Sequence, residues 1–136
     1  MSAVKAVHDL LANNATLIAT VPAAKIFTGK IPLGEQLPAI ATNEISTVEW
    51  NSVGQNAATT LATSRVQVTV QAKTYTEQKA ILALVLKACP NQRGTVNGVS
   101  VDSIVPEGAG PDLRDDEAGI YMQSRDFTVK WVESLS

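Results

Sequence analysis

Residues 65–90 read RVQVTVQAKTYTEQKAILALVLKACP and contain the clearest change of pattern in the chain. As far as Lys73, small apolar residues alternate with polar ones, which is the two-residue period of a strand with one buried face. Residues 74–77 (TYTE) then match a capping box, in which the threonine hydroxyl and the glutamate carboxylate bind the first free amides of a helix. The segment therefore predicts a half-buried antiparallel strand and, directly after it, a helix that ends at Pro90.

The predicted helix is apolar around most of its circumference. Its apolar residues fill positions 80–86 and 88, which is a wider apolar surface than contact with one sheet requires. We expect two of its faces to be covered, one by the sheet and the other by a second helix or another subunit. Leu84 is interpreted as inward-facing, as is Val68 in the preceding strand. Cys89, the only cysteine, excludes an intrachain disulfide and continues the apolar pattern, so we expect a buried thiol.

The residues before this strand predict a helix, a break and two extended segments. Apolar residues at helical spacing favour a helix over residues 2–13, and Asn13-Asn14 offers a stop and a restart before a second short helical turn. Residues 25–28 and 38–50 favour strands, the second with a shift of phase near Asn43-Glu44. Residues 51–64 contain few apolar anchors and are many for a hairpin connection, so we expect a long loop there.

The C-terminal third predicts a hairpin, an acidic loop and a long last strand. Asn97-Gly98 lies between β-branched residues, which is a strong hairpin signal. Residues 106–119 are acidic and rich in glycine, so we expect a second long loop. Along residues 120–133 the apolar positions change parity, which predicts an extra residue near Arg125-Asp126 and a bulge or bend of the strand there. The expected order is α-β-β-β-α-β-β, in a single α+β domain that covers residues 1–136.

Composition and charge exclude several classes of protein. The chain has 136 residues, the usual size of one domain, and its 45% hydrophobic and 18% charged residues argue against disorder. Its net charge of −2 and the absence of a lysine or arginine run argue against tight nucleic-acid binding by one subunit. It has no signal-peptide pattern and no apolar run near the ~20 residues of a membrane span. We therefore expect a soluble protein, made in the cytoplasm, without a membrane partner.

No residue pattern in the sequence is typical of catalysis or of cofactor binding. His8 is the only histidine, and its neighbour Asp9 cannot share its helix face. No serine or cysteine lies in a nucleophile motif. Gly108 and Gly110 resemble part of a phosphate-binding loop, but acids surround them and no basic residue follows as that loop requires. The expectation is a protein without enzyme activity and without a cofactor.

The loop at residues 106–119 carries the one charged cluster of interest. Oxygen ligands on a flexible loop suit calcium, but the spacing does not match an EF-hand, so we expect no metal site. A solvated or partner-facing loop is the favoured interpretation, in which Arg114 pairs with a neighbouring acid or reaches across an interface. The candidate contacts to a partner or to a channel lumen in the two long loops are Asp112, Arg114, Asp115, Asp116, Glu117, Asn51, Gln55 and Asn56.

Several short motifs follow one another along nearly the whole chain. After the N-terminal helix they are KIF at 25–27 with Gly29 and Pro32, LPAI at 37–40, RVQVTV at 65–70 with TYTE, and DFTV at 126–129. In these motifs and their order the chain resembles the tail-completion, or tail-terminator, family of long-tailed bacteriophages.

The resemblance implies both an architecture and a role. The fold it implies is a curved antiparallel or mixed sheet with two helices packed on one side. The role it implies is a hexameric ring in the virion, at the head-proximal end of the tail tube, that stops tube polymerisation and presents a surface to the head. The implied partners are further copies of the chain, the tail tube protein and a head-completion or connector protein. Genomic DNA would pass through the channel without specific binding, and assembly would take place in the host cytoplasm.

Two other interpretations remain open. A head-closure, connector or minor tail subunit differs only in its place in the particle, which the sequence does not encode. A small monomeric ligand-binding or enzyme domain would instead have a deep pocket with convergent polar groups. The widely apolar helix, the two long loops and the lack of catalytic motifs favour a ring subunit, because a neighbour can bury or order such surfaces.

Overall fold

The computed structural model describes residues 2–32, 34–50, 59–90, 94–96, 99–117 and 119–134. Its first half contains α1 (Ser2–Ala12), α2 (Ala15–Thr20), the 3-10 helix η1 (Ala23–Lys25), β1 (Ile26–Thr28), β2 (Ala39–Trp50) and β3 (Thr59–Ala72). Its second half contains α3 (Tyr75–Ala88), β4 (Gly94–Val96), β5 (Val99–Ala109), β6 (Leu113–Asp115) and β7 (Ile120–Ser134). The predicted α+β class is confirmed, and the short helix α2 follows the restart expected at Asn14, whose side chain accepts a hydrogen bond from the Leu17 amide at 2.9 Å.

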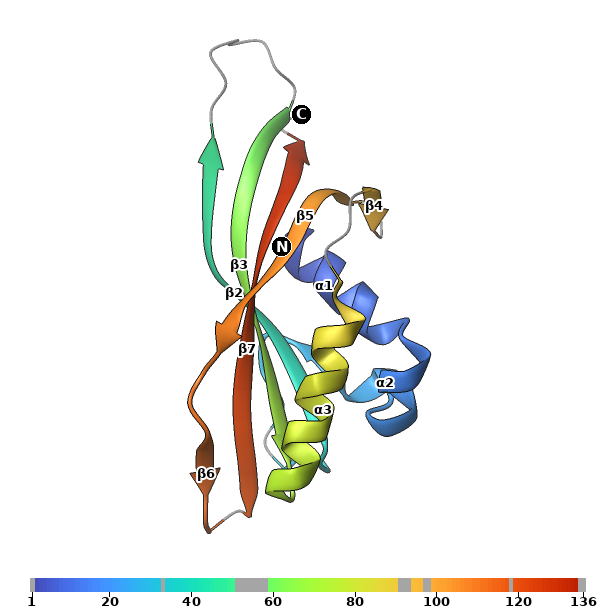
Figure 1. Ribbon diagram of the computed structural model, residues 1–136, viewed down its shortest axis with the longest axis vertical. Coiled ribbons are helices and arrows are strands. Elements are labelled where there is room, and N and C mark those ends of the chain that lie inside the picture. Colours follow the sequence, from blue (N-terminus) through green and yellow to red (C-terminus); the bar gives the residue numbers. More distant parts are fainter. Residues whose placement is uncertain are drawn as a thin grey trace.

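The described strands form one mixed sheet with the order β1-β2-β3-β7-β5-β4, and β6 pairs with β7. The pair of β1 and β2 is parallel, and the other pairs are antiparallel. All three α-helices lie on one side of this curved sheet (Figure 1). At the upper end in this view the long strands pass beyond the helices, while at the lower end the first turn of α3 reaches nearly as far as the start of β7, beside which β6 lies.

The core lies between the sheet and the helices. Every second residue of β3 from Ala62 to Ala72 is fully buried, which confirms the predicted phase of this strand. The strand is longer than the expected residues 65–73 because its first part pairs with both β2 and β7. In α3 the buried positions include Ile81 and Val85, whereas Leu84 is only partly buried at the edge of the core. Leu84 therefore packs against the core as an inward-facing residue should, although it is only partly buried.

The N-terminal cap of α3 forms only in part. The Thr74 hydroxyl accepts a hydrogen bond from the Glu77 amide at 3.1 Å, as the capping box predicts. The reciprocal bond is missing, since one carboxylate oxygen of Glu77 is buried without a hydrogen-bond partner. The helix therefore begins at the predicted place with half of the predicted capping interaction.

Register irregularities lie partly where the sequence predicts them. In β2 the pairing with β3 shifts between Glu44 and Ser46, as the expected change of phase requires. The bulge predicted near Arg125-Asp126 is wrong, because β7 pairs with β3 in continuous register along its length. The shifts lie in β5 instead, the nearer one between Pro106 and Gly108. The same face of β7 points toward the helices along the whole strand. The apolar pattern of the sequence changes only because a buried polar residue, Gln123, occupies a helix-facing position where an apolar residue would be expected.

Both expected long loops are shorter than predicted. Residues 59–64 belong to β3, and residues 51–58 lie outside the described part of the chain. Residues 106–109 continue β5, and residues 113–115 form β6. The hairpin expected at Asn97-Gly98 is supported by the antiparallel pair of β4 and β5, in which Val96 lies opposite Val99, while the two turn residues are outside the described residues.

Candidate partner-contact hairpin

The acidic residues singled out in the sequence lie on one projecting hairpin. We define the acidic hairpin as residues 110–117 and 119–122, which follow β5 and contain β6 and the start of β7 (Figure 1). Leu113, Arg114 and Asp115 pair with the first residues of β7. The structure brings together five of the eight candidates, all of them exposed: Asp112, Arg114, Asp115, Asp116 and Glu117. The other three, Asn51, Gln55 and Asn56, lie outside the described residues.

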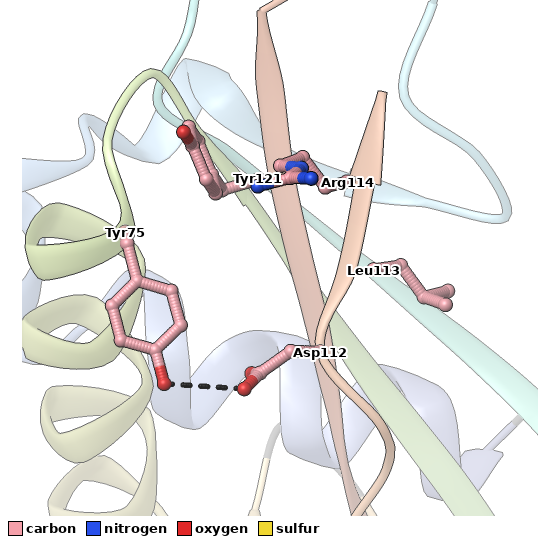
Figure 2. Close-up of a pocket in the computed structure, with 5 residues that line it drawn as sticks. All are labelled: Tyr75, Asp112, Leu113, Arg114 and Tyr121. Atoms are coloured by element: carbon pink, nitrogen blue, oxygen red, sulfur yellow. Dashed lines mark hydrogen bonds between the residues drawn. The ribbon is translucent and has the colours of Figure 1, made fainter. Parts of the chain in front are cut away.

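The root of the acidic hairpin is tied to the first turns of α3. Asp112 accepts hydrogen bonds from the Tyr75 hydroxyl at 3.1 Å and from the Lys79 ammonium at 2.8 Å, one on each carboxylate oxygen (Figure 2 shows the tyrosine contact). The Lys79 ammonium also lies 5.2 Å from the centre of the Tyr75 ring, within cation–π distance. Both partners of the ion pair are partly exposed, with 39% of the Lys79 and 45% of the Asp112 side chain accessible. The hairpin is therefore connected to the helix layer by a polar contact at the surface.

Gln123 joins this contact to the sheet. Its side chain is only 7% exposed, and its carbonyl oxygen accepts a 2.6 Å hydrogen bond from Lys79. Its amide nitrogen donates to the Gly110 carbonyl at 2.8 Å, and the Gly110 amide donates to the Ser124 carbonyl at 2.7 Å. A buried amide with both ends bonded is well satisfied. The connection from Gly110 to Asp112 is thus held at one end by β7 and at the other by α3.

A cavity of about 300 Å³ opens beside this contact, between α3 and the acidic hairpin. It is lined by Tyr75, Asp112, Leu113, Arg114 and Tyr121 (Figure 2). The two tyrosine rings meet edge to face, with centroids 6.4 Å apart. Arg114 forms a 2.9 Å ion pair with Asp116, and both side chains are mostly exposed. The cavity therefore presents aromatic and hydrogen-bonding groups that are common in protein interfaces.

The ionisation of Lys79 and Asp112 follows from their contact. The pKa of Asp112 lies below its ordinary value, chiefly because the carboxylate accepts the Lys79 hydrogen bond. The pKa of Lys79 lies above its ordinary value, chiefly because of the same hydrogen bond to Asp112. The contribution of ionised Asp112 to the free energy of unfolding is therefore present above the ordinary carboxyl pKa. It is lost as the pH falls through the lowered pKa of Asp112. The Lys79 contribution is present below the ordinary lysine pKa and is lost as the pH rises through the raised one.

This pair makes a pH prediction. The carboxyl carbon of Asp112, followed by NMR, should titrate with a midpoint below about 3.9, the ordinary value for aspartate. In the variant Lys79→Met the midpoint should rise, since the largest cause of the shift has been removed. A wild-type midpoint at or above the ordinary value, or one that Lys79→Met leaves unchanged, would contradict the described contact.

The face of the sheet opposite the helices is a second exposed surface. At its centre Arg65 forms an ion pair with Asp126 at 2.6 Å, and the Thr69 and Ser124 hydroxyls are hydrogen-bonded at 3.0 Å. Three apolar side chains lie near the end that is remote from the acidic hairpin. We call them the apolar patch, and their exposed fractions are 53% for Val48, 40% for Leu61 and 37% for Val132. Leu61 and Val132 are direct cross-strand partners, so this end of the sheet is apolar on its helix-free face.

The other residues considered for chemistry have structural positions. His8 is hydrogen-bonded through Nε2 to the Ile26 carbonyl at 2.9 Å, which joins α1 to β1. Cys89 is buried, and burial raises its pKa to about 12, so it is a poor nucleophile. Within the described ranges no group of three or more histidine, cysteine, aspartate or glutamate side chains could hold a metal ion. No helix in that part of the chain is long and apolar enough to cross a membrane.

The residues that hold the acidic hairpin were missed in the sequence. Lys79 and Asp112 are separated by 33 positions, and Lys79 and Gln123 by 44, so no local spacing relates them. One signal was present, namely a glutamine at a helix-facing position of β7, but the parity change around it was interpreted as a bulge. The structure assigns that glutamine to the support of the hairpin.

Comparison with known proteins gives the family of the chain. Residues 5–132 match the family model described as Tail completion protein gp17. The chain belongs to this family. The match covers nearly the whole sequence, so the resemblance stated from the motifs is confirmed, and the role of the protein is a structural one in a phage tail.

A solved structure is similar to this tail completion protein along its whole length. It is a chain from the "Virion of native gene transfer agent (GTA) particle", with a TM-score of 0.64 and 16% sequence identity. The match covers 97% of this chain and 94% of that chain, so the two share a fold. No curated protein matches the sequence significantly.

Proposed function

We propose that this tail completion protein assembles as a hexameric ring on the head-proximal end of the tail tube. There it would end tube polymerisation and present the joining surface to a head-completion or connector protein, without catalysing a reaction. The observation that carries the proposal is the family match over residues 5–132. A place in the virion agrees with this match, and we propose that assembly takes place in the host cytoplasm before heads and tails join.

The distribution of exposed groups supplies one candidate surface for the ring contact and a separate one for another partner. A ring of identical chains requires a head-to-tail contact, in which one patch of a subunit meets another patch of the next. The apolar patch (Val48, Leu61 and Val132) and the acidic hairpin lie at opposite ends of the long strands. One end is thus suited to burial by a neighbour, while the other remains available for a different partner.

The acidic hairpin is the proposed contact to an adjoining ring or to the channel. Its acids would attract basic groups of the tail tube protein or of the connector, which favours correct docking. On the lumen side, the same acids would repel DNA phosphates, so that the genome passes through the channel without specific binding. Charge reversal of these acids would weaken docking if they contact an adjoining ring, and would slow the passage of DNA if they line the channel.

The test is the mass and the location of the assembled protein. Native mass spectrometry of the purified chain at rising concentration should show a closed oligomer, with six copies as the expected number. Added to tails that lack this protein, it should bind at the head-proximal end and allow joining to heads. Binding only at the head, or at the opposite end of the tail, would favour a connector or minor tail subunit. A monomer in the finished particle would reject the ring.

A further inference from the structure

We propose that Lys79 is a positioning residue, which together with Tyr75 and Gln123 fixes the direction of the acidic hairpin relative to α3. The consequence for docking rests on the proposed function, while the fixing itself does not. Lys79 is the centre of the arrangement because its ammonium reaches both the hairpin and the sheet. It donates to Asp112 at 2.8 Å and to Gln123 at 2.6 Å.

The hairpin has few other contacts that could fix its direction. Residues 111–117 are exposed throughout, and β6 pairs with β7 over only three residue pairs. No described residue of β6 belongs to the buried core. β6 is a three-residue edge strand on β7, whose residues Tyr121 and Met122 pair with β3 on their other side. So short a pairing holds β6 only weakly, so its orientation also depends on the contacts at its root.

The support on the other side is firm. Lys79 lies on α3, and this helix is anchored in the core, because its residues Gln78, Ile81 and Val85 are fully buried. Gln123 is nearly buried near the start of β7, where it lies opposite Val70 of β3. Tyr75 adds a hydrogen bond to the second carboxylate oxygen of Asp112, and its ring meets the ring of Tyr121. Asp112 is thereby held from two positions on one rigid helix, so that α3 and the hairpin should move together.

The test compares Lys79→Met with Lys87→Met, an exposed lysine in the last turn of the same helix. Methionine keeps the length and helix preference of lysine but removes its charge and its hydrogen bonds. Amide hydrogen exchange of residues 112–117 should be at least about 5-fold faster in Lys79→Met, because a local opening becomes easier. Lys79→Met should melt at a somewhat lower temperature than Lys87→Met, because the nearly buried Gln123 carbonyl loses its lysine donor. In Lys87→Met the exchange of the hairpin should equal that of the wild type.

A charge swap separates positioning from a general surface effect. The single variant Asp112→Lys should speed the exchange of the hairpin. Lys79→Glu combined with Asp112→Lys should restore part of the protection, because the ion pair forms again with reversed signs, whereas a glutamate at position 79 cannot donate to the Gln123 carbonyl. Docking to tails that lack the protein should fall in each single variant and recover in the swap. If amide exchange of the hairpin is unchanged in Lys79→Met, Lys79 does not fix the hairpin and the proposal is overturned. If exchange is faster in Lys79→Met but docking is unaffected, the proposed consequence for docking is overturned. If the wild type itself does not dock, the proposed function fails, while the exchange measurement still decides whether Lys79 holds the hairpin.

Discussion

Replacement of Phe127 by alanine should lower the free energy of unfolding by about 3–5 kcal/mol, the range for truncating a large buried aromatic side chain. Phe127 is 0% exposed and is among the largest fully buried side chains of the described residues. It faces the helices from the middle of β7, between Val66 of β3 and Pro106 of β5. Only two phenylalanines and two tryptophans are present in the chain, so the aliphatic residues around it cannot easily fill the space it leaves.

The control is Lys130→Ala, an exposed position three residues further along the same strand. We expect a change within about 0.5 kcal/mol, as for most surface substitutions. Chemical denaturation followed by circular dichroism measures both variants. Small domains have about 5–15 kcal/mol of total stability. If the wild type lies near the lower end of this range, Phe127→Ala will be largely unfolded in water; otherwise its unfolding midpoint can still be measured. Equal losses in the two variants would show that the assignment of the helix-facing side of β7 is wrong.

Charge reversal of the acidic hairpin should have the largest effect on assembly. For Asp115→Lys combined with Asp116→Lys we expect at least about tenfold fewer capped tails at low salt, because an attraction across an interface becomes a repulsion. The defect should shrink as salt is added, since salt screens exposed charges over about 10 Å at 0.1 M. The assay adds purified variant to tails that lack the protein, and counts capped tails and infectious particles after joining to heads.

A comparison with an acid outside the hairpin separates the effect of where the charge lies from the effect of the charge itself. Asp115→Lys can be compared with Asp102→Lys, because Asp102 is an exposed acid on β5 outside the hairpin. Only the first should reduce capping. Normal capping with fewer infectious particles would instead place the acids in the lumen, where positive charge slows the passage of DNA. Wild-type levels of both products over a range of salt would remove the hairpin from the mechanism.

Local patterns predicted the part of the fold that local physics determines. The alternation in β3 and the Thr74 cap of α3 are properties of adjacent residues, and both are present in the structure. The strand β6 could not be predicted because three exposed, mostly charged residues carry no strand signal of their own. Its hydrogen-bond partners come from β7, and that pairing depends on the arrangement of the whole sheet.

The sequence predicted where the candidate site lies but not which residues hold it in place. The acidic residues 112–117 were identified because charge and exposure can be inferred from composition alone. Their support was not identified, since Lys79 resembles any solvated lysine on a helix until the fold places Asp112 beside it. Gln123 shares the parity of the buried residues Phe127 and Val129, but the sequence alone does not relate it to Lys79 or Gly110, which it contacts in the structure.

The central claim, that copies of this chain form a ring at the end of the tail tube, is tested most directly by electron cryomicroscopy of capped tails. The reconstruction should show six copies in a closed ring at the head-proximal end, each contacting its neighbours through two different surfaces. The apolar patch of Val48, Leu61 and Val132 should be buried in that assembly. A single copy at the tail end, or density for this chain only elsewhere in the particle, would contradict the account.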